Sequence, residues 1–203
     1  VEHLPDLARP DLQVVSVSGS LNRNLAANPL DIVLGLSQRA GAQGYFLPVP
    51  YLAASEAEKQ VLLAQKSVSD MLGLARKADL LLVGIGSLEA DAHLRQIGML
   101  NEREWNELRA LGAVGDLMGS FIDPAGQPVA AGINRLAMGL GLGDLAGRRV
   151  VALAGGANKA KAVLAALRTG AISDLIIDED AALPMLRLLQ AGRESGHGRS
   201  TKG

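Results

Sequence analysis

Two glycines and a lysine lie between an apolar stretch and an alanine- and leucine-rich stretch, and together they could bind an anion. They are Gly155, Gly156 and Lys159. Glycine has no Cβ, so a ligand can approach its backbone closely. A helix N-terminus presents unpaired amides and about half a positive charge, and a lysine in its first turn adds a full charge. The junction therefore predicts a binding site for phosphate or another anion.

An acid in apolar surroundings could bind hydroxyl groups. Asp116 follows Gly115 in a stretch that is mostly apolar on both sides. A carboxylate in such surroundings is costly to desolvate unless it is paired or hydrogen-bonded. Sugar hydroxyls are good donors to it, so we expect Asp116 to contact a ligand. The alternative is a carboxylate satisfied by backbone amides in a turn.

Two further glycine-bearing segments offer hydrogen-bond donors. One reads Ser-Gly-Ser-Leu-Asn-Arg-Asn over residues 18–24 and includes Gly19, Ser20 and Leu21; the other reads Gly-Ile-Gly-Ser and includes Gly84, Gly86 and Ser87. Their hydroxyls, amides and guanidinium suit phosphate or hydroxyl groups. Neither segment matches a Walker A loop or a dinucleotide fingerprint, so no nucleotide is predicted. The alternatives are a solvated loop for the first segment and a helix cap for the second.

Composition limits the classes of function. The 203 residues include 24 glycines and no cysteine, carry a net charge of -1 and are only 2% aromatic. Disulfide and thiolate chemistry are excluded, and a nucleic-acid surface is not indicated. Few aromatic faces are available for stacking, so a polar ligand would be held by amides and charges. No metal-ligand spacing appears, and no cofactor is predicted.

We expect a cytoplasmic protein, which the absence of cysteine fits. No apolar run approaches the length of about 18 residues that a spanning helix needs, and no signal peptide is recognisable. The chain begins with Val1. We therefore expect a fragment or a processed product.

The predicted elements alternate between strands and helices. Strands are expected at 12–17, 45–49, 79–86, 148–154 and 174–178, with a hairpin around a Pro/Gly turn at 124–126. Helices are expected at 28–40, 55–77 with a break before residue 68, 101–111, 158–168 and 179–190. Asn28 is the expected N-cap of the first helix, Asn101 with Glu104 caps the third, and the strand at 79–86 reads as buried on both faces.

This order predicts an α/β domain with a mostly parallel sheet. Ligands of such sheets bind beyond the carboxyl ends of the strands. The three glycine-bearing strand ends, at residues 19, 84–87 and 155–156, are therefore expected to converge.

An ordered set of motifs resembles the effector domain of SorC-family bacterial transcription regulators. The resemblance spans about residues 12 to 190. The motifs are Gly-Ile-Gly-Ser at 84–87, Leu-Gly-Ala-Val-Gly-Asp at 111–116, Asp123 with Gly126, Ala-Gly-Gly-x-x-Lys-Ala at 154–160, Leu-Arg-Thr-Gly at 167–170, and Asp178-Glu179 with Ala181-Ala182.

The resemblance implies a fold similar to that of ribose-phosphate isomerase and glucosamine-phosphate deaminase, a Rossmann-like sheet flanked by helices with a small inserted lobe. It also implies a phosphorylated sugar or related metabolite as effector, and a homo-oligomer, commonly a tetramer. By its motifs, Gly19 and Ser20 belong to a phosphate loop, Asp116 contacts sugar hydroxyls, Lys159 meets phosphate or sugar, and Asn28 lies near the sugar.

The domain organisation follows from the same resemblance. Residues 1–11 are expected to be a linker remnant, 12–190 the effector-binding domain and 191–203 a disordered tail. The family's helix-turn-helix does not fit into residues 1–11, so operator binding requires a domain outside this chain. The alternative function is a phosphosugar isomerase or deaminase, for which Asp116 or Glu179 could supply the base.

Overall fold

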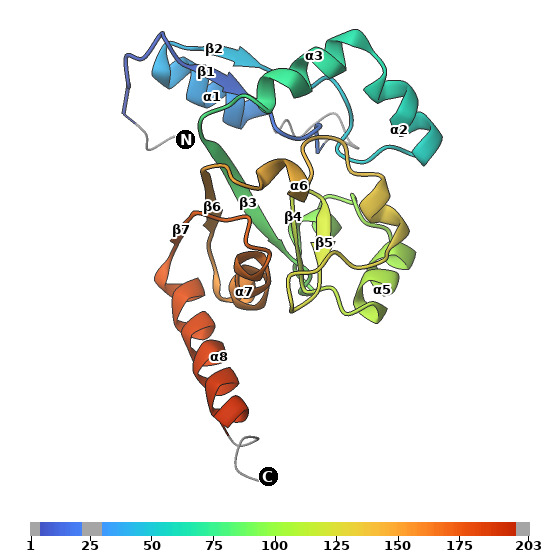
Figure 1. Cartoon of the computed structure of the whole chain (residues 1–203), viewed down its shortest axis with the longest axis vertical. Helices are drawn as coiled ribbons and strands as arrows, with labels where there is room; N and C mark the ends of the chain where they lie inside the picture. Colours follow the sequence, from blue (N-terminus) through green and yellow to red (C-terminus); the bar gives the residue numbers. More distant parts are fainter. Residues whose placement is uncertain (1–4, 22–29, 198–203) are drawn as a thin grey trace.

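A mostly parallel central sheet flanked by helices forms the molecule (Figure 1). The computed structural model describes residues 5–21 and 30–197, with side-chain detail for residues 5–21 and 32–191. The central sheet has the strand order β5-β4-β3-β6-β7, in which β3, β6 and β7 are parallel and β4 and β5 form an antiparallel hairpin. The predicted α/β class is confirmed.

The strands are short and follow the predicted order. They are β1 Gln13–Val15, β2 Gln43–Tyr45, β3 Leu81–Ser87, β4 Gly115–Leu117, β5 Ser120–Ile122, β6 Val150–Ala154 and β7 Asp174–Ile177. β1 and β2 form a separate parallel pair beside α1.

The helices include the predicted break in the second one. They are α1 Leu30–Ala40, α2 Glu56–Leu63, α3 Lys66–Ala75, α4 His93–Gln96, α5 Glu102–Ala110, η1 Gly132–Arg135, α6 Leu142–Leu145, η2 Ala157–Lys159, α7 Ala160–Arg168 and α8 Glu179–His197. α8 continues past residue 190, where the sequence places its end, and projects from the body (Figure 1).

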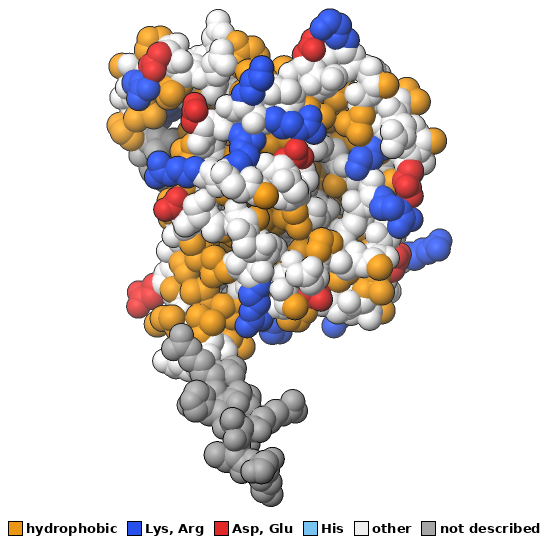
Figure 2. All heavy atoms as spheres, in the orientation of Figure 1, with side chains coloured by type: hydrophobic (Ala, Val, Ile, Leu, Met, Phe, Trp, Pro, Cys, Tyr) orange, Lys and Arg blue, Asp and Glu red, His pale blue; other side chains and the backbone are white. Residues whose placement is uncertain are grey.

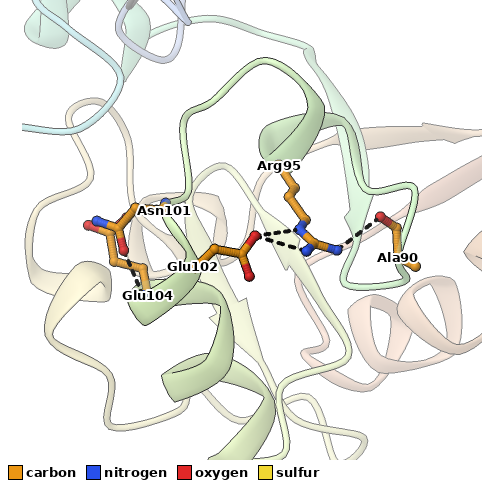
Figure 3. Close-up of polar contacts among 5 residues, drawn as sticks. All are labelled: Ala90, Arg95, Asn101, Glu102 and Glu104. Carbon is orange, nitrogen blue, oxygen red and sulfur yellow. Dashed lines mark hydrogen bonds and ion pairs between the residues drawn. The ribbon is translucent and has the colours of Figure 1, made fainter.

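The start of α5 is fixed by polar contacts (Figure 3). Asn101 Oδ1 accepts a 2.9 Å hydrogen bond from the Glu104 amide, and the Glu104 carboxylate accepts one of 2.9 Å from the Asn101 amide. Arg95 donates to Glu102 at 2.9 Å, and its guanidinium lies 4.9 Å from the ring centroid of Trp105. The predicted capping box is confirmed, and Arg95 fastens α4 to α5.

Two hydrophobic clusters make up the core. The first joins one face of β3, with Val83 and Ile85, to side chains of α3 and α7 such as Leu72 and Val163. The second holds Trp105 and other side chains mostly from the segment between β3 and β6. This segment is the small inserted lobe that the resemblance implies.

On the opposite face of the central sheet, the described residues leave apolar side chains of β3, β6 and β7 exposed. Leu82 is 48% exposed, Leu153 43% and Ile176 58%. Leu153 pairs with Ile176 across β6 and β7, so these side chains share a face. The prediction that residues 79–86 are buried on both faces is wrong, because an unbroken apolar run does not specify what covers each face.

Prolines shorten the second predicted strand. β2 ends at Tyr45 rather than at Val49. Pro48 and Pro50 have no amide for a sheet ladder, and the Val49 carbonyl instead accepts a 2.8 Å hydrogen bond from the Ser20 amide. Leu47 and Val49 of this segment are buried in the first core cluster all the same.

The predicted turn at residues 124–126 is present. Gly126 has φ of 81°, Ile122 forms an antiparallel bridge with Pro128, and the Val129 amide donates to the Phe121 carbonyl at 3.0 Å. The sequence missed an earlier hairpin: β4 and β5 are joined by Met118 and Gly119, with φ of 54° and 79°, which are values typical of a tight two-residue turn.

Candidate functional site

The carboxylate of Asp116 lies on β4 directly over Gly86 of β3. The two residues are paired in register, and a Cβ at position 86 would lie 1.8 Å from Asp116 Oδ1. Asp116 Oδ2 accepts hydrogen bonds from the Gly119 amide at 3.1 Å and from the Tyr51 hydroxyl at 3.2 Å. The glycine at 86 therefore makes room for a carboxylate that two donors hold in place.

Burial dominates the electrostatics of this carboxylate. Asp116 is only 5% exposed, and burial raises the pKa of its carboxyl above 3.8. The Gly119 amide, the Tyr51 hydroxyl and the charge of Lys159 each lower this pKa, but by less than burial raises it. Burial, followed by the charge of Asp116, also raises the pKa of Tyr51 well above 10. Tyr51 is therefore neutral and donates its proton.

Lys159 brings a cation to the same strand end. Its side chain starts at the last residue of η2, and Nζ donates a 2.8 Å hydrogen bond to the Ile85 carbonyl of β3. The ammonium is thus partly buried beside Ile85, the residue before Gly86. It has two further protons to donate.

The two glycines that precede η2 lie against a carboxylate of this chain. The Gly156 amide donates to both oxygens of Asp178, at 3.1 and 2.9 Å, and the Ala181 amide donates to Asp178 Oδ1 at 2.8 Å. A Cβ at Gly155 would come within 2.9 Å of the same carboxylate, and Gly156 has φ of 91°. Asp178 therefore joins this loop to the start of α8.

The first loop is tied down by its backbone. The Gly19 amide donates to the Met138 carbonyl at 2.8 Å, and a Cβ at Gly19 would lie 2.1 Å from the Pro50 carbonyl oxygen. The Ser20 carbonyl accepts a 2.8 Å bond from the Tyr51 amide. Leu21 packs against the second core cluster. Asn28 lies outside the described residues.

Two predicted residues of β3 lie apart from Asp116. Successive side chains of a strand alternate between its faces, so Ser87 lies on the face opposite to Gly86, where α7 packs. Its Oγ is buried and has no hydrogen-bond partner among the described residues. Gly84 lies on the same face as Gly86 and is exposed.

The structure thus brings Gly86, Asp116 and Lys159 together and connects Ser20 to them through Tyr51. Tyr51 and Asp178 are the two side chains of this region to which the sequence assigned no role. The acid just before a predicted helix was a legible signal of a cap. Nothing in the sequence around Tyr51 indicated a contact with Asp116.

A separate cleft of about 550 Å³ runs between the start of α7 and α8. Its lining is largely apolar and includes Asn158, Lys161 and Arg187, but neither Asp116 nor Lys159. In the part of the chain that the structure describes, no cluster of histidine and acid side chains could hold a metal ion, and no helix is long and apolar enough to cross a membrane.

Comparison with known proteins gives a consistent result. Residues 1–187 match the family described as a sugar-binding domain (Sugar-bind). The erythritol catabolism regulatory protein EryD of Brucella abortus is 35% identical over 186 residues, which are 92% of this chain and 59% of EryD. The chain thus spans about three fifths of the length of this relative.

Solved structures show the same fold. A DeoR family transcriptional regulator from Listeria monocytogenes has a TM-score of 0.83 and 27% identity, over 91% of this chain and 73% of that one. The full-length sorbitol operon regulator SorC from Klebsiella pneumoniae has a TM-score of 0.81 at 20% identity, over 93% and 61%; this likeness concerns the fold alone.

Proposed function

Because this chain belongs to the sugar-binding domain family of SorC-type transcriptional regulators, we propose that its strand-end site binds a phosphorylated sugar or a related metabolite as effector. The observation that carries the proposal is the buried Asp116 carboxylate over Gly86, with the Lys159 ammonium at the carbonyl of the preceding residue, Ile85. An acceptor for hydroxyls and a donor for an anion therefore lie a few residues apart.

The hydroxyl end of the ligand belongs at Asp116. Its Oδ2 has two donors already, whereas Oδ1 lies over a residue without a side chain. A carboxylate oxygen has more than one lone pair and accepts from several donors. Adjacent sugar hydroxyls can satisfy Oδ1 and offset the cost of burying the charge.

The phosphate end belongs at Lys159. A phosphate monoester carries roughly -1.5 to -2 charges near pH 7, and each charge-assisted hydrogen bond contributes about 1.5–3 kcal/mol. The ammonium and the first amides of η2 are the donors that we assign to it. The other residues that the sequence assigns to the site stay predictions; they are Gly19, Ser20, Leu21, Asn28, Gly84, Ser87, Gly155 and Gly156. Of these, Gly84 and Ser87 lie apart from Asp116.

The regulator as a whole is a further part of the proposal. We assign operator binding to a helix-turn-helix outside this chain, the working compartment to the cytoplasm, and assembly to a homo-oligomer such as a dimer or tetramer. An effector changes operator affinity only if it binds one state of that assembly better than another.

The competing function, a phosphosugar isomerase or deaminase, has no observation of its own in its favour. Catalysis at the sugar needs a positioned base, and Asp116 is engaged by Gly119 and Tyr51. The relatives are transcriptional regulators. Incubation with ribose 5-phosphate or glucosamine 6-phosphate is expected to yield no product.

A thermal-shift series tests the proposed effector class. The probes are ribose 5-phosphate, glucosamine 6-phosphate and erythritol 4-phosphate, each beside its unphosphorylated counterpart. A ligand at about a hundred times its Kd adds about 2.7 kcal/mol of stability, or roughly 5–10 °C in Tm for a chain of this size. We expect such a shift with at least one phosphorylated probe.

Matched lysine variants locate the site. Lys159→Met should remove the shift, whereas Lys161→Met should keep it, because Lys161 is paired with Glu89 at the surface, 3.1 Å away. A shift that is equal in both variants, or no shift with any probe, contradicts the proposal.

A further inference from the structure

Tyr51 lies between the candidate site and the first loop. Its ring is buried, at 6% exposed, in the second core cluster with Phe121. Its hydroxyl donates to Asp116 Oδ2 at 3.2 Å, across 65 positions of the sequence. It is a buried side chain whose polar end points at the candidate ligand-binding carboxylate.

The backbone of Tyr51 is held from two sides. Its amide donates to the Ser20 carbonyl at 2.8 Å, and its carbonyl accepts from the Met138 amide at 2.9 Å. Met138 in turn accepts from the Gly19 amide at 2.8 Å. The backbone around Tyr51 is therefore one unit with the first loop, and its hydroxyl extends that unit to Asp116.

The two donors to Asp116 come from different places. The Gly119 amide belongs to the turn that follows Asp116 in its own hairpin, so it moves with the carboxylate. Tyr51 approaches from the segment after β2 and fixes the carboxylate relative to the first loop. Among the described residues, no other hydrogen bond of the Asp116 side chain leads to the segment that holds Ser20.

We propose that Tyr51 is a positioning residue of the effector site: its hydroxyl sets the orientation of the Asp116 carboxylate and couples that carboxylate to the loop of Gly19 and Ser20. The inference rests on the proposed function in that Asp116 is the group that meets the ligand. A ligand that moves the Asp116 carboxylate would then also move the first loop, through the hydrogen bond to the Tyr51 hydroxyl and through the tyrosine ring.

The test compares Tyr51→Phe with Tyr45→Phe. Phenylalanine keeps the ring in its cluster and removes only the hydroxyl. Tyr45 is the matched control, because its hydroxyl donates to Gln43 at 2.6 Å and lies apart from the site. The first measurement needs no ligand: carbon-detected NMR follows the titration of the Asp116 carboxyl in each protein.

The expected results separate positioning from packing. The Tyr51 hydroxyl lowers the pKa of Asp116, so Tyr51→Phe should move the titration of Asp116 to higher pH, and Tyr45→Phe should leave it in place. Lys159 is the charged group that faces Asp116 from η2, and it is unchanged in both variants. Binding of ribose 5-phosphate, measured by calorimetry, should weaken about tenfold in Tyr51→Phe alone.

The pH profile is the readout that a purely structural role would not move. Because the same probe is used for every protein, the ionisation of its phosphate affects all the pH profiles equally. The loss of affinity on acidification should therefore begin at higher pH in Tyr51→Phe than in wild type. An unchanged Asp116 titration together with unchanged affinity overturns the inference. If Tyr51→Phe shifts the Asp116 titration but the wild-type chain binds none of the sugar phosphates, the positioning role stands and the proposed function is contradicted instead.

Discussion

At the scale of single residues, an added methyl group at Gly86 should lower the stability of the fold. A Cβ there would lie 1.8 Å from Asp116 Oδ1, whereas a Cβ at Gly84, on the same face of β3, would have no heavy atom within 4 Å. Gly86→Ala should lower the free energy of unfolding by about 1–3 kcal/mol and weaken effector binding. Gly84→Ala should be neutral or slightly stabilising.

Urea unfolding of both variants measures this difference. An alanine at 84 that costs as much as an alanine at 86 would show that loss of backbone freedom, and not the carboxylate, explains why glycine is needed.

Asp116 should destabilise the fold at neutral pH. Its folded-state pKa is raised above 3.8 by burial, so the stabilising form is the neutral one. The stabilisation of the fold by the protonated carboxyl is complete below the unfolded-state pKa and is lost as the pH rises through the folded-state pKa. Asp116→Asn should therefore raise Tm at pH 7.5, on the order of 2–4 °C for each kcal/mol regained, while it weakens effector binding.

Thermal unfolding between pH 4.5 and 8 checks the sign of this effect. The difference in Tm between Asp116→Asn and wild type should become smaller as the pH falls toward 4.5. A variant that is less stable than wild type at pH 7.5 would mean that the ionised carboxylate stabilises the fold.

The sequence could single out Asp116 and Lys159 but not Tyr51. An acid in an apolar stretch and a lysine in a first helical turn conflict with their local surroundings, and such conflicts can be read locally. Tyr51 conflicts with nothing near it in the sequence. Its role follows from a hydrogen bond to a residue 65 positions away, which requires the fold.

At the scale of elements, the loop before η2 and the start of α8 depend on one carboxylate. Asp178 accepts from the Gly156 amide at 2.9 Å and from the Ala181 amide at 2.8 Å. Asp178→Ala removes a helix cap, which costs about 0.5–2 kcal/mol, and frees the glycine loop. We expect lower stability and faster hydrogen exchange at the Gly156 and Ala181 amides.

Asp180→Ala is the control for Asp178. It removes an acid from the same first turn of α8, and in the described part of the chain Asp180 makes no hydrogen bond to the glycine loop. Equal exchange rates at Gly156 in the two variants would contradict the assignment of Asp178 as the joint between the two elements.

The strand–glycine–helix units were predictable because their signals are local. Apolar runs, caps and glycines with positive φ lie next to the elements that they define, as at Asn101 and Gly41. β2 was misjudged because Leu47 and Val49 are buried without being in a ladder. The hairpin of β4 and β5 was missed because Met118 adopts a φ of 54°, a value that a methionine in the sequence does not indicate.

At the scale of the whole molecule, the described residues leave one face of β3, β6 and β7 exposed, which is the open face of the sheet. Periodicity shows which residues share a face, but it does not show what packs against that face. Leu82, Leu153 and Ile176 are exposed on β3, β6 and β7, and hydrophobic side chains also gather over the first turns of α8 (Figure 2), where Leu183 and Leu186 are exposed. Parallel sheets are generally covered on both faces.

The open face predicts self-association of the purified chain. Burial of an exposed aliphatic side chain contributes about 1.5–3 kcal/mol when it is complete, so a partly exposed pair such as Leu153 and Ile176 is enough to weaken or strengthen an interface about tenfold or more. The double variant Leu153→Ser with Ile176→Ser should therefore move the mass measured by light scattering toward that of the monomer, with little loss of Tm.

Val61→Ser on α2 is the matched control, since Val61 is 65% exposed but lies away from the sheet. It should leave the association unchanged. If the sheet variant associates as strongly as wild type, or if the α2 variant loses association to the same degree, the open face of β6 and β7 is not the contact. The exposed leucines of α8, Leu183 and Leu186, then become the next surface to alter.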